Sequence, residues 1–178
     1  MSSIDLIILG ILLEKPQSAY DIQKDVDYHH FSRWTKVSVP TIYKKVLYLR
    51  ERGYLESETT KGSNFAEKAV YSITDKGKEY FEQLMDDCSG RQIPLLFDFN
   101  VVIANLNKME KSKALKLVEK LRNNIKAMTQ INHEYALEYM DIPLVGKTII
   151  EQQRLLYLAL LEWLDTFENQ FKSEQHGY

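Results

Sequence analysis

The sequence predicts a mainly α-helical protein with two modules: an N-terminal module that includes one β-hairpin, and a C-terminal module of helices alone. Three observations support this fold class. Apolar residues recur at intervals of three and four over long stretches of the 178-residue chain, which is the spacing of one face of an α-helix. Residues 54–73 instead alternate in the manner of two strands around a polar tip. The chain also has only seven glycines and four prolines, which leaves little material for long irregular loops.

Two helices are expected in the first part of the chain. The apolar residues of segment 4–12 share one helix face, and Asp5 lies among them. Ser18 can cap a second helix, because its hydroxyl can accept a hydrogen bond from a backbone N–H of the first turn. Either Tyr20 or Ile22 is expected to face inward from that helix.

A third helix is expected to be capped by Ser38. Pro40 then falls in the first turn, where the missing N–H of proline removes no hydrogen bond. Ile42 and Val46 face the core at helical spacing, and the helix ends at Gly53, which is placed as a glycine just beyond a helix should be.

A β-hairpin follows, with strands at residues 54–60 and 69–73 and a polar tip at residues 61–64. Thr74 then opens a fourth helix, which carries Leu84 on its apolar face. Three helices, a hairpin and another helix follow one another in the order of a winged helix-turn-helix. In such a domain the third helix reads the DNA major groove and the hairpin is the wing.

The composition changes at the boundary between residues 1–89, the expected winged-helix DNA-binding domain, and residues 90–178, the expected helical dimerisation domain. In the second domain an apolar helix is expected at residues 95–103. A long helix capped by Ser112 comes next, and a last helix follows Pro143.

The centre of this last helix, residues 155–164, is apolar almost all round, and a module of three helices is too small to cover it alone. We therefore expect a homodimer. Helical spacing places the candidate dimer contacts on one face: Leu156, Leu160, Trp163 and Phe167. A second possibility is a pocket for a small aromatic or hydrophobic effector, with Phe97, Tyr135, Tyr139 and Tyr157 as candidates. The sequence leaves open whether these rings line a pocket or belong to the dimer core.

The net charge of −2 and the pI of about 6.1 argue against a general polyanion binder, but the charge is unevenly distributed. Residues 28–50 contain no Asp or Glu and five Lys or Arg, so one face could attract DNA phosphates. Because Ile42 and Val46 face inward, Thr41 and residues 43–45 are expected to point largely outward. The candidate DNA-binding residues are Lys36, Ser38, Thr41, Tyr43, Lys44, Lys45, Lys61, Asn64 and Lys68.

Four blocks of the sequence, in order and register over roughly residues 4–85, resemble the PadR family of transcriptional regulators. They contain LLEKP followed by AYDI, then VSVPTIY, LRERGYL and YSITDKG. The resemblance implies a homodimer, in most members a repressor, whose helical C-terminal module dimerises and in some members senses small aromatic or hydrophobic compounds. Two positions depart from the family pattern: Ala19 stands where glycine is common, and Glu67 lies in a wing that is commonly rich in Pro and Arg.

The leading interpretation is a dimeric repressor that binds a palindromic operator through its third helix. The alternative is an adaptor that keeps the winged helix but binds only protein.

We expect neither catalysis, nor a cofactor, nor a metal. The GKT at residues 146–148 lacks the first glycine of a phosphate-binding loop, and His29 and His30 have no partners at ligand spacing. The single cysteine, Cys88, fits a reducing cytosol, and no apolar run is long enough to span a membrane. We therefore expect a cytoplasmic protein with no membrane partner.

Overall fold

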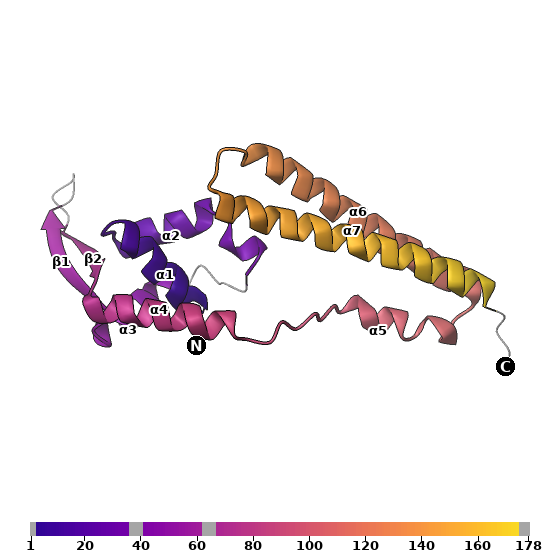
Figure 1. Cartoon of the computed structure of the whole chain (residues 1–178), viewed down its shortest axis with the longest axis horizontal. Helices are drawn as coiled ribbons and strands as arrows, with labels where there is room; N and C mark the ends of the chain where they lie inside the picture. The colour runs from indigo at the N-terminus through magenta and orange to yellow at the C-terminus, as the bar shows by residue number, and fades with distance from the viewer. Residues whose placement is uncertain (1–2, 36–40, 62–66, 175–178) are drawn as a thin grey trace. The chain divides into compact units, whose positions relative to one another are not determined.

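The computed structural model describes residues 3–35, 41–61 and 67–174, and only the backbone of residues 60, 61 and 67. Contacts within the chain divide it into two compact units, residues 1–93 and 94–178 (Figure 1). This division falls four residues beyond the boundary expected from the composition. Each unit is described by itself.

The first unit is a winged helix, which confirms the predicted fold class. Its elements are α1 (Ser3–Glu14), α2 (Ala19–Tyr28), the 3-10 turn η1 (Phe31–Arg33), α3 (Ile42–Glu51), β1 (Leu55–Lys61), β2 (Glu67–Ile73) and α4 (Asp75–Ser89). The apolar faces of the four α-helices and one side of the hairpin form a single core. Its fully buried side chains include Ile8, Ile22, Val46 and Leu84.

Local signals in the sequence begin and end these helices as expected. The backbone N–H of Asp21 donates to Ser18 Oγ at 3.2 Å at the start of α2, and the N–H of Gly77 donates to Thr74 Oγ at 3.1 Å at the start of α4. After α3, Gly53 has a φ of 76°, a conformation that glycine adopts without steric cost. Tyr20 is exposed, whereas Ile22 takes the inward position on α2.

The wing is a two-stranded antiparallel sheet, with a register that runs from Leu55 opposite Ile73 to Lys61 opposite Glu67. Gln17, in the turn between α1 and α2, forms an isolated bridge with Tyr71 of β2. The Gln17 N–H donates to the Tyr71 carbonyl at 3.0 Å, and the Tyr71 N–H donates back at 2.8 Å. These two hydrogen bonds hold the base of the wing against the turn that leads into α2.

A buried ion pair joins α1 to α3. The Asp5 side chain is only 4% exposed, and Lys45 Nζ lies 3.0 Å from its Oδ1 and 3.3 Å from its Oδ2. The same ammonium group lies 5.1 Å from the centre of the Tyr48 ring. The expectation that Lys45 points largely outward is therefore wrong. A carboxylate buried among apolar residues needs a partner, and Lys45 turns inward to supply it.

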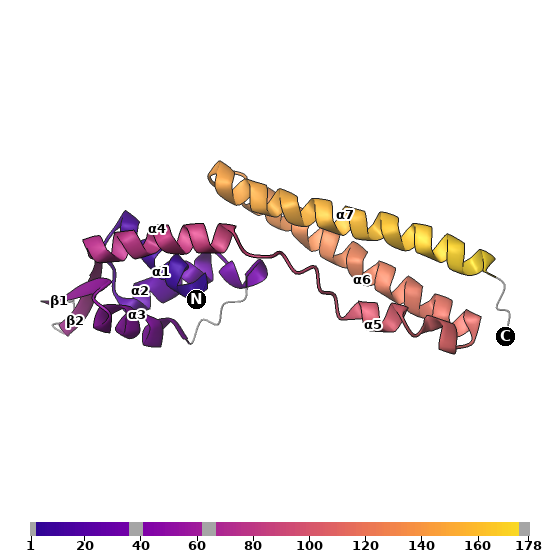
Figure 2. The same cartoon turned by 60° about the horizontal axis from the view of Figure 1, so that its bottom comes forward.

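The second unit is helical, with α5 (Phe99–Ile103), the 3-10 turn η3 (Leu106–Lys108), α6 (Lys111–Glu138) and α7 (Leu144–Ser173). The long helices α6 and α7 pack side by side as an antiparallel pair (Figures 1 and 2). Their buried residues include Val118 and Leu164.

Polar contacts also join α6 to α7. Arg122 of α6 pairs with Asp165 at 2.9 Å and with Glu168, and Lys172 pairs with Glu168 at 2.6 Å. These two cations hold the pKa of Glu168 below its usual range, Lys172 having the larger effect. Towards the other end of the pair, Asn132 Nδ2 donates to the Ile150 carbonyl at 3.2 Å.

The start of the second unit differs from the expectation. A helix was expected to run over residues 95–103, but α5 has five residues and Leu96 is 85% exposed. Consecutive apolar residues spread round a helix, so only a few of them could share a covered face. The long helix also begins one residue before its expected cap: Ser112 lies inside α6, where its hydroxyl donates to the Glu110 carboxylate instead of accepting from a backbone N–H at the start of the helix.

The close approach of α4 to the chain after α3 gives a first prediction. A Cβ on Gly77 would lie 2.1 Å from the Tyr54 carbonyl oxygen and 2.7 Å from Ile73 Cγ1. The backbone must therefore move in Gly77→Ala, and we expect a loss of about 3 kcal/mol in the free energy of unfolding, measured by urea denaturation. Gly90→Ala is the matched control. Its Cβ would meet nothing closer than 3.8 Å, so the stability should stay constant or rise by up to about 1 kcal/mol. Equal losses in the two variants would contradict this close packing.

The Asp5–Lys45 pair gives a second prediction. Lys45→Met keeps the length of the side chain but leaves a buried carboxylate without its cation, so we expect a loss of about 2 kcal/mol. Lys44→Met, at the neighbouring exposed position, should change the stability by no more than about 0.5 kcal/mol. Hydrogen exchange of the α1 and α3 amides reports on this unit separately. Combining Lys45→Met with Asp5→Asn should restore part of the protection, and failure to do so would show that the charge of Asp5 is not the cause.

Candidate nucleic-acid interface

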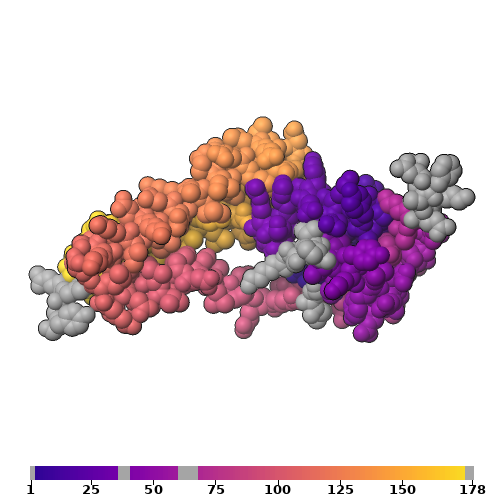
Figure 3. Space-filling model, turned by 180° about the vertical axis from the view of Figure 1, so that it is seen from behind, coloured from indigo at the N-terminus to yellow at the C-terminus, as the bar shows by residue number. Residues whose placement is uncertain are grey.

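The helical period turns one face of α3 to the core and the opposite face to solvent. Ile42, Val46 and Leu49 are fully buried. Tyr43 is 60% exposed, and Thr41 and Lys44 are also exposed. The space-filling view shows atoms of this part of the chain, in purple, at the surface of the N-terminal unit (Figure 3). The hydroxyl of Thr41, the phenol of Tyr43 and the ammonium group of Lys44 are thus exposed together at the first turns of α3. The apolar side of the same helix packs in the core and holds the helix in place.

Two tyrosines that pack against the core of this unit also interact with the polar surroundings of Asp5, an arrangement that the sequence did not predict. Tyr54 and Tyr80 stack with ring centres 4.1 Å apart. Burial raises the pKa of Tyr80, and the Asp5 carboxylate raises it further. Asp5 therefore influences both Lys45 of α3 and a tyrosine of α4. The available signal was a single acidic residue within the apolar face of the first helix.

The wing carries one of the predicted DNA contacts, Lys68, in an ion pair. Its Nζ lies 2.6 Å from Asp21 Oδ2, and the Ser18 hydroxyl donates to the same oxygen at 2.7 Å. Both contacts lower the pKa of Asp21, and the hydrogen bond from Lys68 has the larger effect. Sequence reasoning missed Asp21 as well, because the pairing depends on the way the hairpin folds back onto α2.

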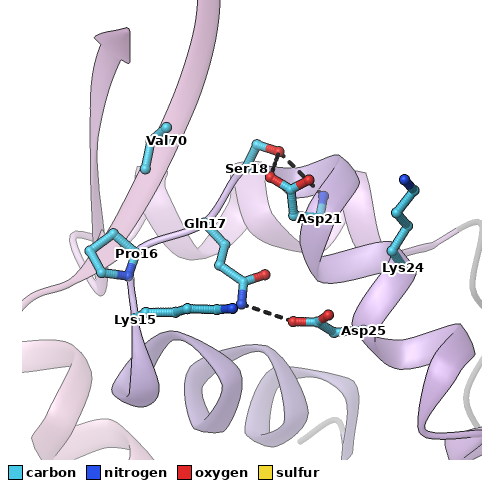
Figure 4. Close-up of a pocket in the computed structure, with 8 residues that line it drawn as sticks. All are labelled: Lys15, Pro16, Gln17, Ser18, Asp21, Lys24, Asp25 and Val70. Atoms are coloured by element: carbon cyan, nitrogen blue, oxygen red, sulfur yellow. Dashed lines mark hydrogen bonds between the residues drawn. The ribbon is translucent and has the colours of Figure 1, made fainter. Parts of the chain in front are cut away.

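A hollow of about 380 Å³ lies beside the start of α2 (Figure 4). It is lined by Lys15, Pro16, Gln17, Ser18, Asp21, Lys24, Asp25 and Val70. Gln17 Nε2 donates to Asp25 Oδ2 at 2.8 Å, and Lys24 Nζ lies 4.8 Å from the centre of the exposed Tyr20 ring. Both carboxylates at this hollow therefore have partners within the chain.

The structure does not place every predicted DNA contact. Lys36, Ser38 and Asn64 lie outside the described residues, and so does the side chain of Lys61 at the end of β1. The described candidates fall into two groups. Thr41, Tyr43 and Lys44 form the exposed face of α3, whereas Lys45 and Lys68 each pair with a carboxylate.

The four predicted dimer contacts divide between two faces of α7. Leu156 is 44% exposed and Trp163 is 38% exposed. Leu160 and Phe167 are half-buried and pack against the core of their own unit. Leu155 and Leu158 are exposed as well. This unit therefore leaves an apolar surface on α7 uncovered.

The predicted effector residues lie in separate places along the helix pair. Tyr135 and Tyr139 have ring centres 4.3 Å apart, near the part of α6 where Asn132 contacts Ile150. Phe97 stacks on Phe99, whose ring centre is 5.9 Å from that of Trp163. Ile150 and Trp163 are thirteen residues apart on α7, which corresponds to about 20 Å along the axis. Tyr157 packs against the core of the unit. One protomer therefore does not gather these four rings around a single point.

Within the described parts of the chain, no three His, Cys, Asp or Glu side chains are grouped so that they could hold a metal ion. Among the helices that the structure describes, none has the length and apolar character needed to cross a membrane.

The family comparison and the structural comparisons agree. The model of the Transcriptional regulator PadR-like family matches residues 8–83. PadR from Bacillus subtilis in complex with operator DNA has a TM-score of 0.76 and 19% identity, covering 96% of this chain and 99% of that chain. The same protein in complex with p-coumaric acid has a TM-score of 0.75 and 16% identity, with 96% of each chain covered.

A second regulator has the same fold. The PadR-like transcriptional regulator BC1756 from Bacillus cereus has a TM-score of 0.68 and 22% identity, covering 97% of this chain and 99% of that chain. No curated protein sequence matches the chain. Residues 8–83 therefore match the PadR-like family of transcriptional regulators, and the chain as a whole shares the fold of the PadR structures.

Proposed function

We propose that this protein is a DNA-binding transcriptional repressor that reads its operator with the exposed face of α3. The observation that carries the proposal is the joint exposure of Thr41, Tyr43 and Lys44 on a helix whose other face is fully buried. B. subtilis PadR, which shares the fold, has been solved with operator DNA. The comparable proteins are regulators of transcription, and we propose no catalytic activity or cofactor for this one.

The chemistry of this face suits the DNA major groove. A groove-reading helix presents its first turns to the base edges, where hydroxyl and ammonium groups can donate to base acceptors. The positive end of the helix dipole meets the phosphates at the same place. Lys44 makes no ion pair within the described residues, so its charge is available to a phosphate or a guanine. Because a transcriptional repressor acts at the chromosome, we propose a cytoplasmic protein.

We further propose a homodimer on a palindromic operator, formed through the exposed apolar surface of α7. Two-fold symmetry in the protein matches two-fold symmetry in the site and sets two recognition helices about 34–36 Å apart, one turn of DNA. A single α3 contributes one set of base contacts. The second copy supplies the other set and covers Leu156 and Trp163 at the same time.

We also propose that a small aromatic or hydrophobic effector releases the DNA. B. subtilis PadR has been solved with p-coumaric acid, and the second unit of this chain offers two groups of rings, one with Tyr135 and Tyr139 and one with Phe97. Flat aromatic ligands suit apolar walls that carry a few hydroxyl groups. The tyrosine pair supplies those hydroxyls.

The contribution of α3 is tested by substituting its exposed residues. Lys44→Ala and Tyr43→Ala should each weaken binding to promoter DNA about 5- to 150-fold, because a lost base or phosphate contact costs about 1–3 kcal/mol. Thr41→Ala should relax the sequence preference more than it lowers the affinity. Fluorescence anisotropy with labelled promoter fragments measures both effects. Lys126→Ala, which removes an exposed lysine of α6, is the control and should leave the affinity unchanged.

Unchanged affinity in both Lys44→Ala and Tyr43→Ala would show that α3 is not the reading element. No affinity of the native chain for any promoter fragment at low salt would instead favour the protein-binding adaptor, since phosphate contacts are strongest there.

The dimer is tested by charging the exposed surface of α7. Leu156→Arg combined with Trp163→Arg should yield monomers in light scattering, because neither side chain is part of the buried core of its own unit and two-fold symmetry would bring four arginines together. The monomer should bind DNA weakly and without sequence preference. Gln152→Arg, at an exposed position of the same helix, is the control.

If the double variant remains a dimer with full operator affinity, the dimer contact lies elsewhere, for example at Val101 and Val102 of α5, which are also exposed.

A further inference from the structure

We propose that Asp21 limits the DNA affinity of the protein by competing with DNA phosphates for the wing residue Lys68. The inference rests on the proposed DNA-binding function and assigns a role to a carboxylate that lies outside the reading helix. Asp21 would act as an internal substitute for a phosphate: its carboxylate occupies the ammonium group that the wing would otherwise offer to the DNA backbone.

The pairing is held from both sides. Asp21 lies in the first turn of α2, where its N–H donates to Ser18 Oγ at 3.2 Å and its carboxylate accepts from the same hydroxyl at 2.7 Å (Figure 4). On the other side, Lys68 is on β2, three residues before Tyr71, whose backbone is bonded to Gln17. Gln17 comes directly before Ser18 in the chain. The carboxylate and the ammonium group therefore project from segments that are fixed to each other, and they meet at 2.6 Å.

The helix also favours the charged form of Asp21. Backbone N–H groups at the start of a helix stabilise a negative charge in the first turn, and contacts with Lys68 and Ser18 lower the pKa of this carboxyl group. Asp21 is therefore fully ionised at neutral pH. It presents to Lys68 the same kind of charged oxygen acceptor as a DNA phosphate.

The exposure of the pair makes the competition reversible. The side chains of Lys68 and Asp21 are 43% and 41% exposed, and an ion pair in solvent contributes only about 0–1 kcal/mol. A phosphate can therefore displace the carboxylate, but the gain from the new contact is reduced by the loss of the old one. The buried Asp5–Lys45 pair has a different character, since removing Asp5 would disturb the core.

The consequence falls mainly on binding that does not depend on sequence. Phosphate contacts supply nearly all of the affinity for random DNA, whereas base contacts made by α3 distinguish the operator. Asp21 neutralises a cation of the wing. It therefore lowers the affinity for random DNA by a larger factor than it lowers the affinity for the operator. We therefore assign Asp21 to operator specificity.

The test uses the full-length protein and Asp21→Asn, which removes the charge and retains a side-chain oxygen that can accept the hydrogen bond from the Ser18 hydroxyl. Asp75→Asn is the matched control. Asp75 is also in the first turn of a helix and pairs with an exposed lysine, Lys78, at 2.8 Å, and its substitution changes the net charge by the same amount. Binding to a labelled duplex of random sequence is measured by anisotropy over a series of salt concentrations.

Asp21→Asn should bind random DNA about 3- to 10-fold more tightly at low salt, and the slope of log K against log salt should become steeper by about 0.9, the value for one additional phosphate contact. Asp75→Asn should match the native protein. In a Lys68→Ala background the substitution of Asp21 should have no effect, because the competing cation is absent. Since a gain of affinity is expected, a poorly folded variant cannot mimic the result.

A slope and affinity in Asp21→Asn equal to those of Asp75→Asn would overturn the proposal, and so would a gain that persists without Lys68. Either outcome leaves the proposed function intact, since the native chain then still binds DNA. If no form of the protein binds any DNA, both the inference and the proposed function fail.

Discussion

One buried carboxylate determines how α3 meets its surroundings. Asp5 lies inside the apolar face of α1 with its side chain 4% exposed, and a charge in that position must have a partner. Lys45 supplies it. Because successive residues of a helix are rotated by about 100° from one another, drawing Lys45 inward fixes the direction of its neighbours, and Tyr43 and Lys44 face the solvent. The pair therefore acts together with Ile42, Val46 and Leu49, which anchor the same helix in the core. The proposed recognition of DNA by the exposed face depends on this arrangement, because a helix free to rotate would offer no constant set of donors to the base edges.

The two ion pairs of the winged helix have a common effect on charge. Lys45 and Lys68 were both predicted DNA contacts, and each is paired with a carboxylate from α1 or α2. Lys44 and Arg50 are left as exposed cations of α3. A protein with a net charge of −2 gains little from long-range attraction to DNA, so the few unopposed donors must carry the interaction. Such a distribution favours a binder that depends on base contacts over one that holds any DNA tightly.

The elements of the N-terminal unit could be predicted from the sequence because their determinants are local. Ser18 and Thr74 cap helices through hydrogen bonds within three residues, and Gly53 ends α3 in a conformation that few other residues adopt. The prediction failed where distant residues decide the outcome. The inward turn of Lys45 depends on Asp5, forty residues away, and the pairing of Lys68 with Asp21 depends on the hairpin returning to α2. Residues 95–97 lie outside a helix although they are apolar, because an apolar segment forms a stable helix only where it has a surface to pack against.

In the C-terminal unit, too, the sequence predicts that a helix is covered without showing what covers it. The apolar centre of α7 predicts cover on more than one side, and within one protomer the helix pair with α6 covers the side that carries Leu164 and Phe171. Leu155, Leu156 and Leu158 stay exposed on the rest of the helix surface. Exposed leucines on a 30-residue helix are costly in water, at about 25 cal/mol for each Å² of apolar surface. In the proposed dimer, a second copy of the same helix covers them with a self-complementary surface. In the proposed dimer, the α7 contact sets the spacing of the two reading helices. In the same proposal, an effector that binds among the aromatic rings of this unit acts by shifting the two-fold interface, which moves both reading helices at once.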